Sequence, residues 1–238
     1  MGDKKAVVLL SGGLDSATVL SMAKADGYSI YALSFNYGQR HDIETKCSRL
    51  IAKNIVVEHR FMNIDLGNFG GSALTSDMPI PKHENIDQIG SDIPITYVPA
   101  RNTIFLSFAL AYAEVIDAYD IFIGVNALDY SGYPDCRPEF IMSFEETANL
   151  ATASGVKGNK IIIHAPLINL TKAQIISKGI ELDVDYSITT SCYDPSSTGL
   201  ACGKCDACLL RLKGFSEVGI KDPRKYRIKQ NIKKYTKE

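Results

Sequence analysis

The sequence predicts an α/β fold in which helices cover both faces of a doubly wound, mainly parallel sheet. Short apolar runs rich in β-branched residues alternate with longer segments of helical periodicity, as in repeated βαβ units. The alternation stops after Leu182, and four of the six cysteines then follow close together. We therefore expect an α/β domain over residues 1–182 and a small metal-organised segment over residues 183–238.

The expected elements alternate regularly along the first domain. Five apolar runs are predicted to be strands, namely Ala6–Leu10, Ile30–Phe35, Ile55–Met62, Ile121–Val125 and Lys160–His164. Helices are predicted at Asp15–Ala25, Asp42–Lys53, Arg101–Ala118, Glu139–Ser154 and Thr171–Lys178, with a further one in the C-terminal segment at Cys205–Val218. Right-handed crossovers between these strands build the doubly wound sheet.

One long segment, residues 63–99, has no such periodicity and is rich in Gly, Ser, Pro, Asp and Asn. Loops of this length within a domain are uncommon unless they are functional or mobile. We interpret it as a lid or mobile loop over one face of the sheet, with a plain disordered insertion as the alternative.

The charge balance and the N-terminal residues bear on nucleic-acid binding and on the location in the cell. The 26 Lys and Arg residues nearly balance the 27 Asp and Glu residues, which gives a formal net charge of −1. Nucleic-acid-binding proteins typically carry an excess of basic residues, and this composition shows none. We expect no stable nucleic-acid binding. Met1 leads directly into a strand-like run, with no apolar stretch long enough for a signal peptide or a membrane span. The expected location is the cytoplasm, without membrane association.

The strongest local motif is Ser11-Gly12-Gly13-Leu14-Asp15-Ser16, between the first strand and the first helix. Its glycines permit a tight turn close to an anion, and the following helix offers free N–H groups and the positive end of its dipole. The sequence lacks both the P-loop motif and the dinucleotide fingerprint at this place. A pyrophosphate site and a simple turn capped by Asp15 or Ser16 both remain open on the residues alone.

A second polar segment runs from Gly124 to Phe140, after a predicted strand and before a predicted helix. Open α/β sheets bind ligands at the carboxyl ends of their strands. The carboxylates in this segment suit amino or ring N–H donors, and its arginine suits a carboxylate, so a guanine-like ring that bears a carboxylate would satisfy both. The structural alternative is that Asp129 and Asp135 form turns and Tyr133 packs in the interior.

The cysteines Cys192, Cys202, Cys205 and Cys208 have the spacing C-x9-C-x2-C-x2-C. Three thiolates near the start of one helix and a fourth from a preceding loop can form a closed tetrahedral zinc site. An iron–sulfur cluster and a redox-active Cys-x-x-Cys pair are the alternatives. Zinc is favoured over a catalytic pair, because a pair would leave the other two thiols without a role.

The phosphate motif resembles the signature Ser-Gly-Gly-x-Asp-Ser of the PP-loop ATP pyrophosphatases, whose fold is that of the adenine nucleotide alpha hydrolases. The resemblance implies cleavage of ATP between its α and β phosphates to adenylate an oxygen. It implies ATP binding by the loop Leu10, Ser11, Gly12, Gly13, Leu14, Asp15 and Ser16. It also implies that Asp15 orders Mg²⁺ and pyrophosphate, and that Lys172 neutralises phosphate charge.

Three further strings are similar to the 7-cyano-7-deazaguanine synthases (QueC family) of queuosine biosynthesis, and together the motifs span essentially the whole chain. The strings are Tyr37-Gly38-Gln39-Arg40-His41, Tyr97-Val98-Pro99-Ala100-Arg101-Asn102 and Ser131-Gly132-Tyr133-Pro134-Asp135-Cys136-Arg137. The resemblance implies a carbon–nitrogen ligase that converts 7-carboxy-7-deazaguanine and ammonia to the nitrile 7-cyano-7-deazaguanine (preQ0). Adenylated acid and amide intermediates would form, with release of AMP and pyrophosphate.

The same resemblance implies the parts of the site. Arg101 joins Asp15 and Lys172 as a catalytic residue, and the substrate-binding residues are Asp129, Tyr133, Asp135 and Arg137. One structural zinc ion per chain, Mg²⁺ with ATP, and a homodimer complete the expectation.

Three other functions remain as alternatives. A tRNA-thiolating enzyme of the same superfamily would need a catalytic cysteine, an RNA-binding extension and a basic face, and the last two are missing here. A zinc-dependent nucleic-acid-binding module would show salt-dependent RNA binding. The same adenylating chemistry could also act on a different substrate.

Overall fold

The computed structural model describes residues 4–90, 92–128 and 132–227. Within them, five strands form one sheet in the order β3-β2-β1-β4-β5, and each neighbouring pair is parallel. The strands are β1 (Lys5–Leu9), β2 (Ser29–Asn36), β3 (Glu58–Asn63), β4 (Asp120–Phe122) and β5 (Ile162–His164). The fold class predicted from the sequence is confirmed.

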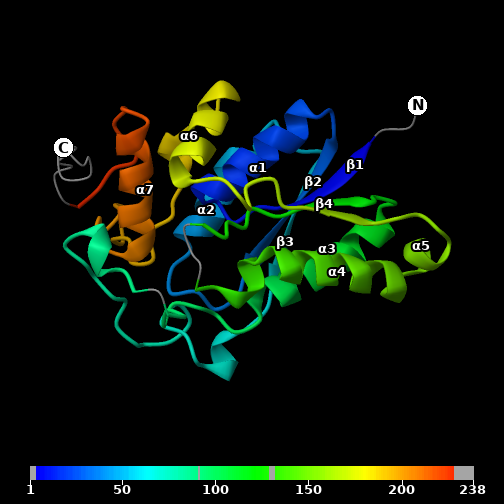
Figure 1. The fold of residues 1–238 in the computed structure, drawn as a ribbon, viewed down its shortest axis with the longest axis horizontal. Coiled ribbons are helices and arrows are strands. Elements are labelled where there is room, and N and C mark those ends of the chain that lie inside the picture. The colour runs from blue at the N-terminus through cyan, green and yellow to red at the C-terminus, as the bar shows by residue number, and fades with distance from the viewer. Residues whose placement is uncertain (1–3, 91, 129–131, 228–238) are drawn as a thin grey trace.

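Helices cover both faces of this sheet. Figure 1 shows α1 (Leu14–Ala25), α2 (Ile43–Ala52) and α6 (Lys172–Glu181) on one side, and α3 (Arg101–Val115) and α4 (Pro138–Ala151) on the other. The short α5 (Ala153–Val156) follows α4. Because both faces are covered, Ala6, Val7 and Val8 of the central strand are all fully buried, which explains why β1 is a continuous apolar run.

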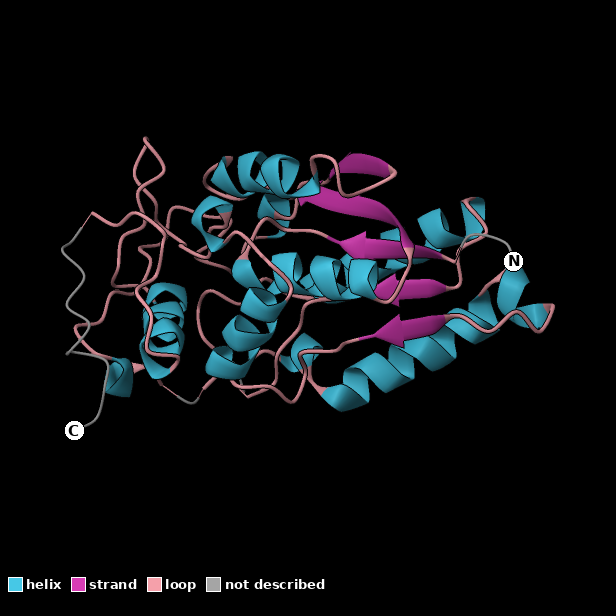
Figure 2. Ribbon diagram, turned by 90° about the horizontal axis from the view of Figure 1, so that it is seen from above, coloured by secondary structure: helices cyan, strands magenta, loops and turns pink. Residues whose placement is uncertain are grey.

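The strand order reverses at β1, which pairs with β2 on one edge and with β4 on the other. Chains leaving these strands diverge at their carboxyl ends and open a crevice there. Figure 2 shows that the strands point towards the side of the molecule where the long loops gather. The topology therefore places the glycine turn after β1 and the polar segment after β4 at the same edge.

Two helices on opposite faces have well-formed N-termini that fix residues near this edge. In α6, Thr171 accepts a hydrogen bond from the backbone N–H of Gln174, and the side chain of Gln174 accepts one from the N–H of Thr171. In α3, the N–H of Asn102 donates to the distant carboxylate of Asp135 at 2.9 Å, since its own N-cap, Ala100, has no side chain that can cap.

After β3, the described residues of the long segment at 63–99 include two single-turn 3₁₀ helices, at Gly67–Phe69 and Ile86–Gln88, and the rest of those residues are irregular. Leu66, Leu74 and Val98 are buried in the core formed with α3, so the loop is anchored along its length. It also contacts the cysteine segment, where the N–H of His83 donates to the carbonyl of Lys204 at 2.8 Å. Its role as a lid stays a prediction.

The C-terminal segment contains α7 (Asp206–Glu217), which packs against α6. Phe215 joins the core beneath α1 and α6, whereas the four clustered cysteines join the core on the α3 side. A buried ion pair holds the segment together from within: Arg211 of α7 binds Asp222 through two hydrogen bonds of 2.7 and 2.9 Å and also donates to the hydroxyl of Thr189. The domain division at residue 182 stays a prediction.

The expected elements are all present, and their boundaries differ in two informative places. β4 ends at Phe122 rather than Val125, because residues 123–126 leave the sheet to border a cavity. The helix expected over Glu139–Ser154 breaks at Thr152, whose hydroxyl accepts the N–H of Gly155 and starts α5. In the described part of the chain, no helix has the length and apolarity required to span a lipid bilayer.

The buried ion pair yields a stability prediction. We expect Asp222→Ala to lower the free energy of unfolding by about 3–5 kcal/mol, because it leaves the Arg211 guanidinium charged and buried without its partner. Urea titration followed by circular dichroism measures the change.

The matched control is Glu181→Gln, which removes an ion pair with Lys178 whose side chains are 46% and 64% exposed. That variant should change the free energy of unfolding by less than about 0.5 kcal/mol. Equal effects from the two substitutions would contradict the role assigned to Arg211 and Asp222.

Candidate active site

A cavity of about 220 Å³ opens at the carboxyl ends of β1, β2 and β4, where the strand order reverses. Its walls come from both faces of the sheet and from the C-terminal segment. Polar and ionisable groups in the wall are supplied by Ser11, Asp15, Ser16, Tyr37, Glu44, Arg101, Asn102, Asn126, Tyr133, Cys136, Lys172, Thr190, Ser191, Tyr193 and Arg211. The cavity therefore joins the phosphate motif to most of the polar strings identified in the sequence.

The glycine turn between β1 and α1 lies at one end of this cavity. Gly12 has a φ of +92°, and a Cβ atom there would lie 2.3 Å from the carbonyl oxygen of Glu44, so only glycine fits. Gly13 is the N-cap of α1 and no side chain caps that helix, which leaves the N–H groups of its first turn available to a ligand. Ser11 and Ser16 add hydroxyl groups 3.1 Å apart. The turn has the donors and the helix dipole of an anion site.

Asp15 and Lys172 meet beside this turn, although they are far apart in sequence. The Lys172 Nζ atom donates to both carboxylate oxygens of Asp15, at 2.8 and 3.0 Å. Lys172 is the first residue of α6, and its position is set by the capping of that helix and by Asn126, whose amide donates to the carbonyls of Leu167 and Leu170. A cation and a carboxylate thus lie together at the phosphate end of the cavity.

Thr190 is a member of this end of the cavity that the sequence did not identify. Its backbone N–H donates to the carbonyl of Gly12 at 2.9 Å, and its buried hydroxyl has no hydrogen-bond partner among the described residues. A buried hydroxyl without a partner is costly unless a ligand or water satisfies it. A phosphate oxygen in the cavity would be a suitable partner.

Arg101 lies in the cavity wall, as predicted, at the start of α3. Its guanidinium carbon is 6.0 Å from the centre of the Tyr37 ring. Burial alone would lower the pKa of Arg101, but Tyr37, Tyr133 and Asp135 together raise it, so the guanidinium stays charged. The cavity therefore holds a permanent positive charge apart from the Lys172–Asp15 pair.

The four predicted substrate residues differ in position. Tyr133 lines the cavity, and its hydroxyl lies 3.0 Å from that of Thr96 and 3.2 Å from that of Tyr193. Asp135 is buried behind the wall and binds the N-terminus of α3, which makes it a support for Arg101 in this structure. Asp129 lies outside the described residues.

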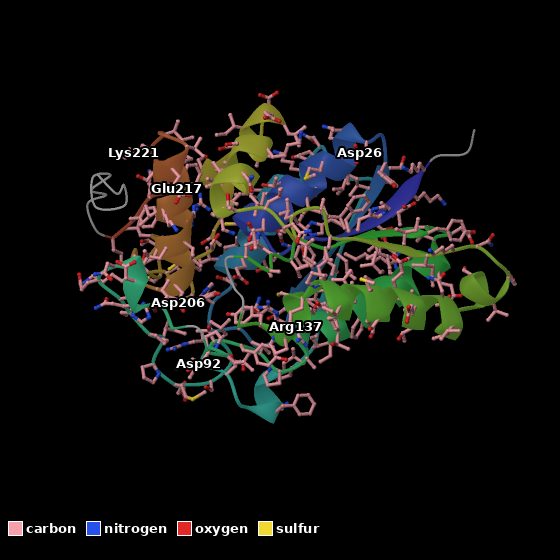
Figure 3. All side chains as sticks on the ribbon, viewed as in Figure 1. Asp26, Asp92, Arg137, Asp206, Glu217 and Lys221 are labelled. Atoms are coloured by element: carbon pink, nitrogen blue, oxygen red, sulfur yellow. The ribbon has the colours of Figure 1, made fainter. Side chains whose placement is uncertain are left out.

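Arg137 is exposed and its guanidinium donates to the carbonyl of Pro134 at 3.1 Å. It lies outside the cavity lining, at the start of α4, on the side of the molecule where Asp92 of the long loop is found (Figure 3). The substrate-binding roles of all four residues stay predictions.

Cys136 lies in the wall but is poorly suited to be a nucleophile. Burial, followed by the charge of Asp135, raises the pKa of its thiol to about 12. The amide of Asn102 donates towards its sulfur at 3.4 Å. A protonated, buried thiol supports a packing role.

Glu44 is another residue that the sequence analysis missed. It lies in the first turn of α2 and lines the cavity, and burial raises the pKa of its carboxyl to about 7, partly offset by the charge of Arg101. The sequence feature that could have identified Glu44 is its position three residues after the string that ends at His41. An acidic residue in the first turn of a helix, however, usually has only a capping or dipole role.

The four cysteines of the C-terminal segment converge as predicted. All are buried, and their sulfur atoms lie within 4.8 Å of one another. The sulfurs of Cys202 and Cys208 are 3.9 Å apart, close to the separation of about 3.8 Å that a tetrahedral zinc ion with Zn–S bonds of about 2.3 Å requires. Backbone N–H groups donate to the sulfurs of Cys192 and Cys202, which stabilises thiolates. The cluster can hold one metal ion, and its geometry is consistent with zinc.

Comparison with known proteins agrees with this site. The family model described as "Queuosine biosynthesis protein QueC" matches residues 5–219. A protein named 7-cyano-7-deazaguanine synthase from Desulfatibacillum aliphaticivorans is 64% identical over 225 residues, covering 94% of this chain and 97% of that protein. The chain belongs to the QueC family. The resemblance inferred from the sequence motifs is thereby confirmed.

A second relative of this QueC-family chain, from Citrifermentans bemidjiense, carries the same name and is 62% identical over 224 residues, with 94% and 98% of the two chains covered. Among solved structures, a 4-thiouridine synthetase in complex with RNA and bound ATP has a TM-score of 0.50 and 21% identity. The match covers 78% of this chain and 42% of that one. At this level of identity the likeness supports the shared PP-loop fold alone.

The cysteine cluster yields a metal prediction. We expect about one zinc ion per chain in the purified QueC-family protein, and Cys205→Ser should release most of it and destabilise the segment around α7. Metal analysis by mass spectrometry and a thermal melt measure both effects.

Cys47→Ser is the control, since Cys47 is equally buried but lies on α2 outside the cluster. Its metal content should match that of the wild type. Iron with acid-labile sulfide in place of zinc would contradict the single-ion interpretation.

Proposed function

We propose that the chain is a 7-cyano-7-deazaguanine synthase, which converts 7-carboxy-7-deazaguanine and ammonia to the nitrile at the expense of ATP. The observation that supports it best is the single cavity that joins the glycine turn and the Asp15–Lys172 pair to Arg101 and a group of tyrosines. Family membership and the names of its relatives give the reaction.

The first step must activate a carboxylate, which is a poor electrophile. In the proposal, its oxygen attacks the α-phosphate of ATP, forming an acyl adenylate and releasing pyrophosphate. The first turn of α1, Lys172 and Thr190 supply donors and positive charge for the phosphates. Asp15 offers a carboxylate for the Mg²⁺ that accompanies ATP, and it orients Lys172.

The later steps exchange oxygen for nitrogen. Ammonia displaces AMP from the acyl adenylate to give an amide, and a second ATP adenylates the amide oxygen. Loss of the two remaining protons from nitrogen and of AMP from carbon then gives the nitrile. Because both activations place negative charge at the same phosphate site, one glycine turn can serve both.

Arg101 is suited to hold the substrate carboxylate or the α-phosphate during these steps. It stays charged, and it lines the same cavity as the glycine turn and a group of aromatic side chains. These side chains include Phe35 and Phe105, which stack with ring centres 3.9 Å apart, and Tyr37 against Phe105. An apolar, aromatic wall of this kind suits a flat heterocycle.

Zinc, a homodimer and a cytoplasmic location belong to the same proposal. The reduced four-cysteine cluster supports a reducing compartment. The cysteines argue against a thiolating enzyme, which needs a reactive thiolate. Burial keeps the thiol of Cys136 protonated, and four of the other cysteines lie together in the metal-binding cluster.

The direct test is to incubate the purified protein with 7-carboxy-7-deazaguanine, an ammonium salt and Mg-ATP, and to identify the products by mass spectrometry. We expect the nitrile together with AMP and pyrophosphate. AMP without the nitrile would mean that the adenylation is right and the substrate wrong, and ADP with inorganic phosphate would contradict the proposed bond cleavage.

A second prediction concerns Lys172. Its aliphatic stem packs against Gly214 of α7, so Lys172→Met keeps the packing and removes only the charge. We expect kcat/KM for ATP to fall about 10²–10³-fold, as for the loss of one electrostatic donor in a closed site.

The control is Lys178→Met on the same helix, since Lys178 is half exposed and forms a surface ion pair with Glu181. Its kcat/KM should stay within about twofold of the wild type. A Lys172→Met enzyme with normal ATP turnover would contradict a role in phosphate binding.

A further inference from the structure

Ammonium enters the proposed reaction with all its protons and leaves as a nitrile nitrogen with none. One proton must be lost before nitrogen can attack the acyl adenylate, and another leaves the adduct when the amide forms. The remaining ones leave the adenylated amide as AMP departs. A cavity that performs these steps therefore needs a proton acceptor near the reacting nitrogen. This requirement rests on the function proposed above.

The described residues of the cavity wall offer few proton acceptors. Tyr37, Tyr133 and Cys136 are held protonated, because burial raises the pKa of each group. No histidine belongs to the described lining. Asp15 and Glu44 are the carboxyl groups in that lining, and Asp15 is bound by Lys172 at the phosphate end.

Glu44 is placed differently from Asp15. Among the described residues, none forms a hydrogen bond or ion pair with its carboxyl, although the residue is partly buried in the cavity wall. Its position is rigid, because the backbone of α2 at Glu44 packs directly on Gly12, with no room for even a methyl group between them. The backbone of Glu44 is therefore held beside the phosphate turn, and its side chain belongs to the wall of the cavity.

The charged and titratable groups around Glu44 come from three elements. Arg101 on α3 attracts its carboxylate, and the hydroxyl of Tyr37, after β2, also interacts with it electrostatically. On α2 itself the interacting group is the thiol of Cys47. A carboxyl poised to exchange a proton near neutral pH is effective as a general base.

We propose that Glu44 is the general base that removes protons from the substrate nitrogen, first from ammonium and the amine adduct and then from the adenylated amide. In the first step ammonium transfers a proton to the Glu44 carboxylate, and the free ammonia forms the C–N bond as the C–O bond to AMP breaks. In the last stage the adenylated amide nitrogen carries two protons and loses one of them to solvent. Glu44 then takes the remaining N–H proton, the nitrogen electrons form the C≡N bond, and AMP leaves. The protons pass to solvent between steps.

Glu44→Gln tests this role, because it preserves the size of the side chain and removes its basicity. Each half of the reaction is measured separately by rapid quench. The acid with Mg-ATP and no ammonium reports adenylation as a pyrophosphate burst, and the amide analogue of the substrate with Mg-ATP reports the dehydration to nitrile without any ammonia.

We expect the pyrophosphate burst of Glu44→Gln to stay within about threefold of wild type, while nitrile formation from the amide falls at least about 10²-fold. For the wild type, nitrile formation from the amide should rise as the pH increases through about 7, where Glu44 loses its proton. In Glu44→Gln the rate of nitrile formation should not show this rise with pH, and Glu44→Asp should restore part of the rate. Glu146→Gln, on the exposed side of α4, is the control with wild-type behaviour.

Four results would overturn the proposal. Normal nitrile formation by Glu44→Gln would exclude a base at this position. An equal loss of the pyrophosphate burst would assign Glu44 to nucleotide binding instead. A wild-type enzyme that makes the nitrile at a rate that does not rise with pH near 7 would exclude Glu44 from the proton transfer and leave the proposed function intact. A wild type that makes no nitrile would contradict both proposals.

Discussion

The contact between Gly12 and the first turn of α2 is the constraint on which the rest of the site depends. A Cβ at Gly12 would lie 2.3 Å from the carbonyl oxygen of Glu44 and 2.9 Å from the N–H nitrogen of Ser48. Because the two backbones touch, the glycine turn, the start of α1 and the start of α2 form one rigid unit. The carbonyl of Gly12 also accepts the N–H of Thr190, so the C-terminal segment is fixed to the same unit.

This arrangement explains why a cysteine cluster that can hold a metal ion lies next to the cavity. The cysteine segment supplies Thr190, Tyr193 and Arg211 to the wall of the cavity. Between Cys192 and Cys202 the cysteine segment is irregular and has few apolar side chains that could form a core. A metal ion bound by the cysteines would therefore stabilise its conformation. The buried Arg211–Asp222 pair fixes the other end of the segment.

The sequence was sufficient for the fold, the glycine turn and the convergence of the four cysteines, because each of these features has a local signal. Buried parallel strands are continuous apolar runs, glycines with positive φ are hard to replace, and cysteine spacing limits how thiols can meet. The meeting of Asp15 and Lys172 was also within reach, but only through the family resemblance.

The features that the sequence did not yield are those that depend on long-range packing. Asp135 and Arg137 belong to the same polar string of the sequence. Asp135 is nevertheless buried against the start of α3, whereas Arg137 is exposed. Glu44 belongs to the cavity because α2 packs on Gly12, which no pattern near Glu44 indicates. Thr190 is likewise brought to the phosphate turn by a contact across more than half of the chain.

The central claim is that one phosphate site activates oxygen twice by adenylation, and the transfer of ¹⁸O tests it most directly. The substrate acid is labelled in both carboxyl oxygens, converted completely with Mg-ATP and ammonium, and the phosphorus-containing products are analysed by mass spectrometry. The account predicts that both labels end in AMP, one from the acid and one from the amide. Label in inorganic phosphate, in pyrophosphate or in water would contradict it.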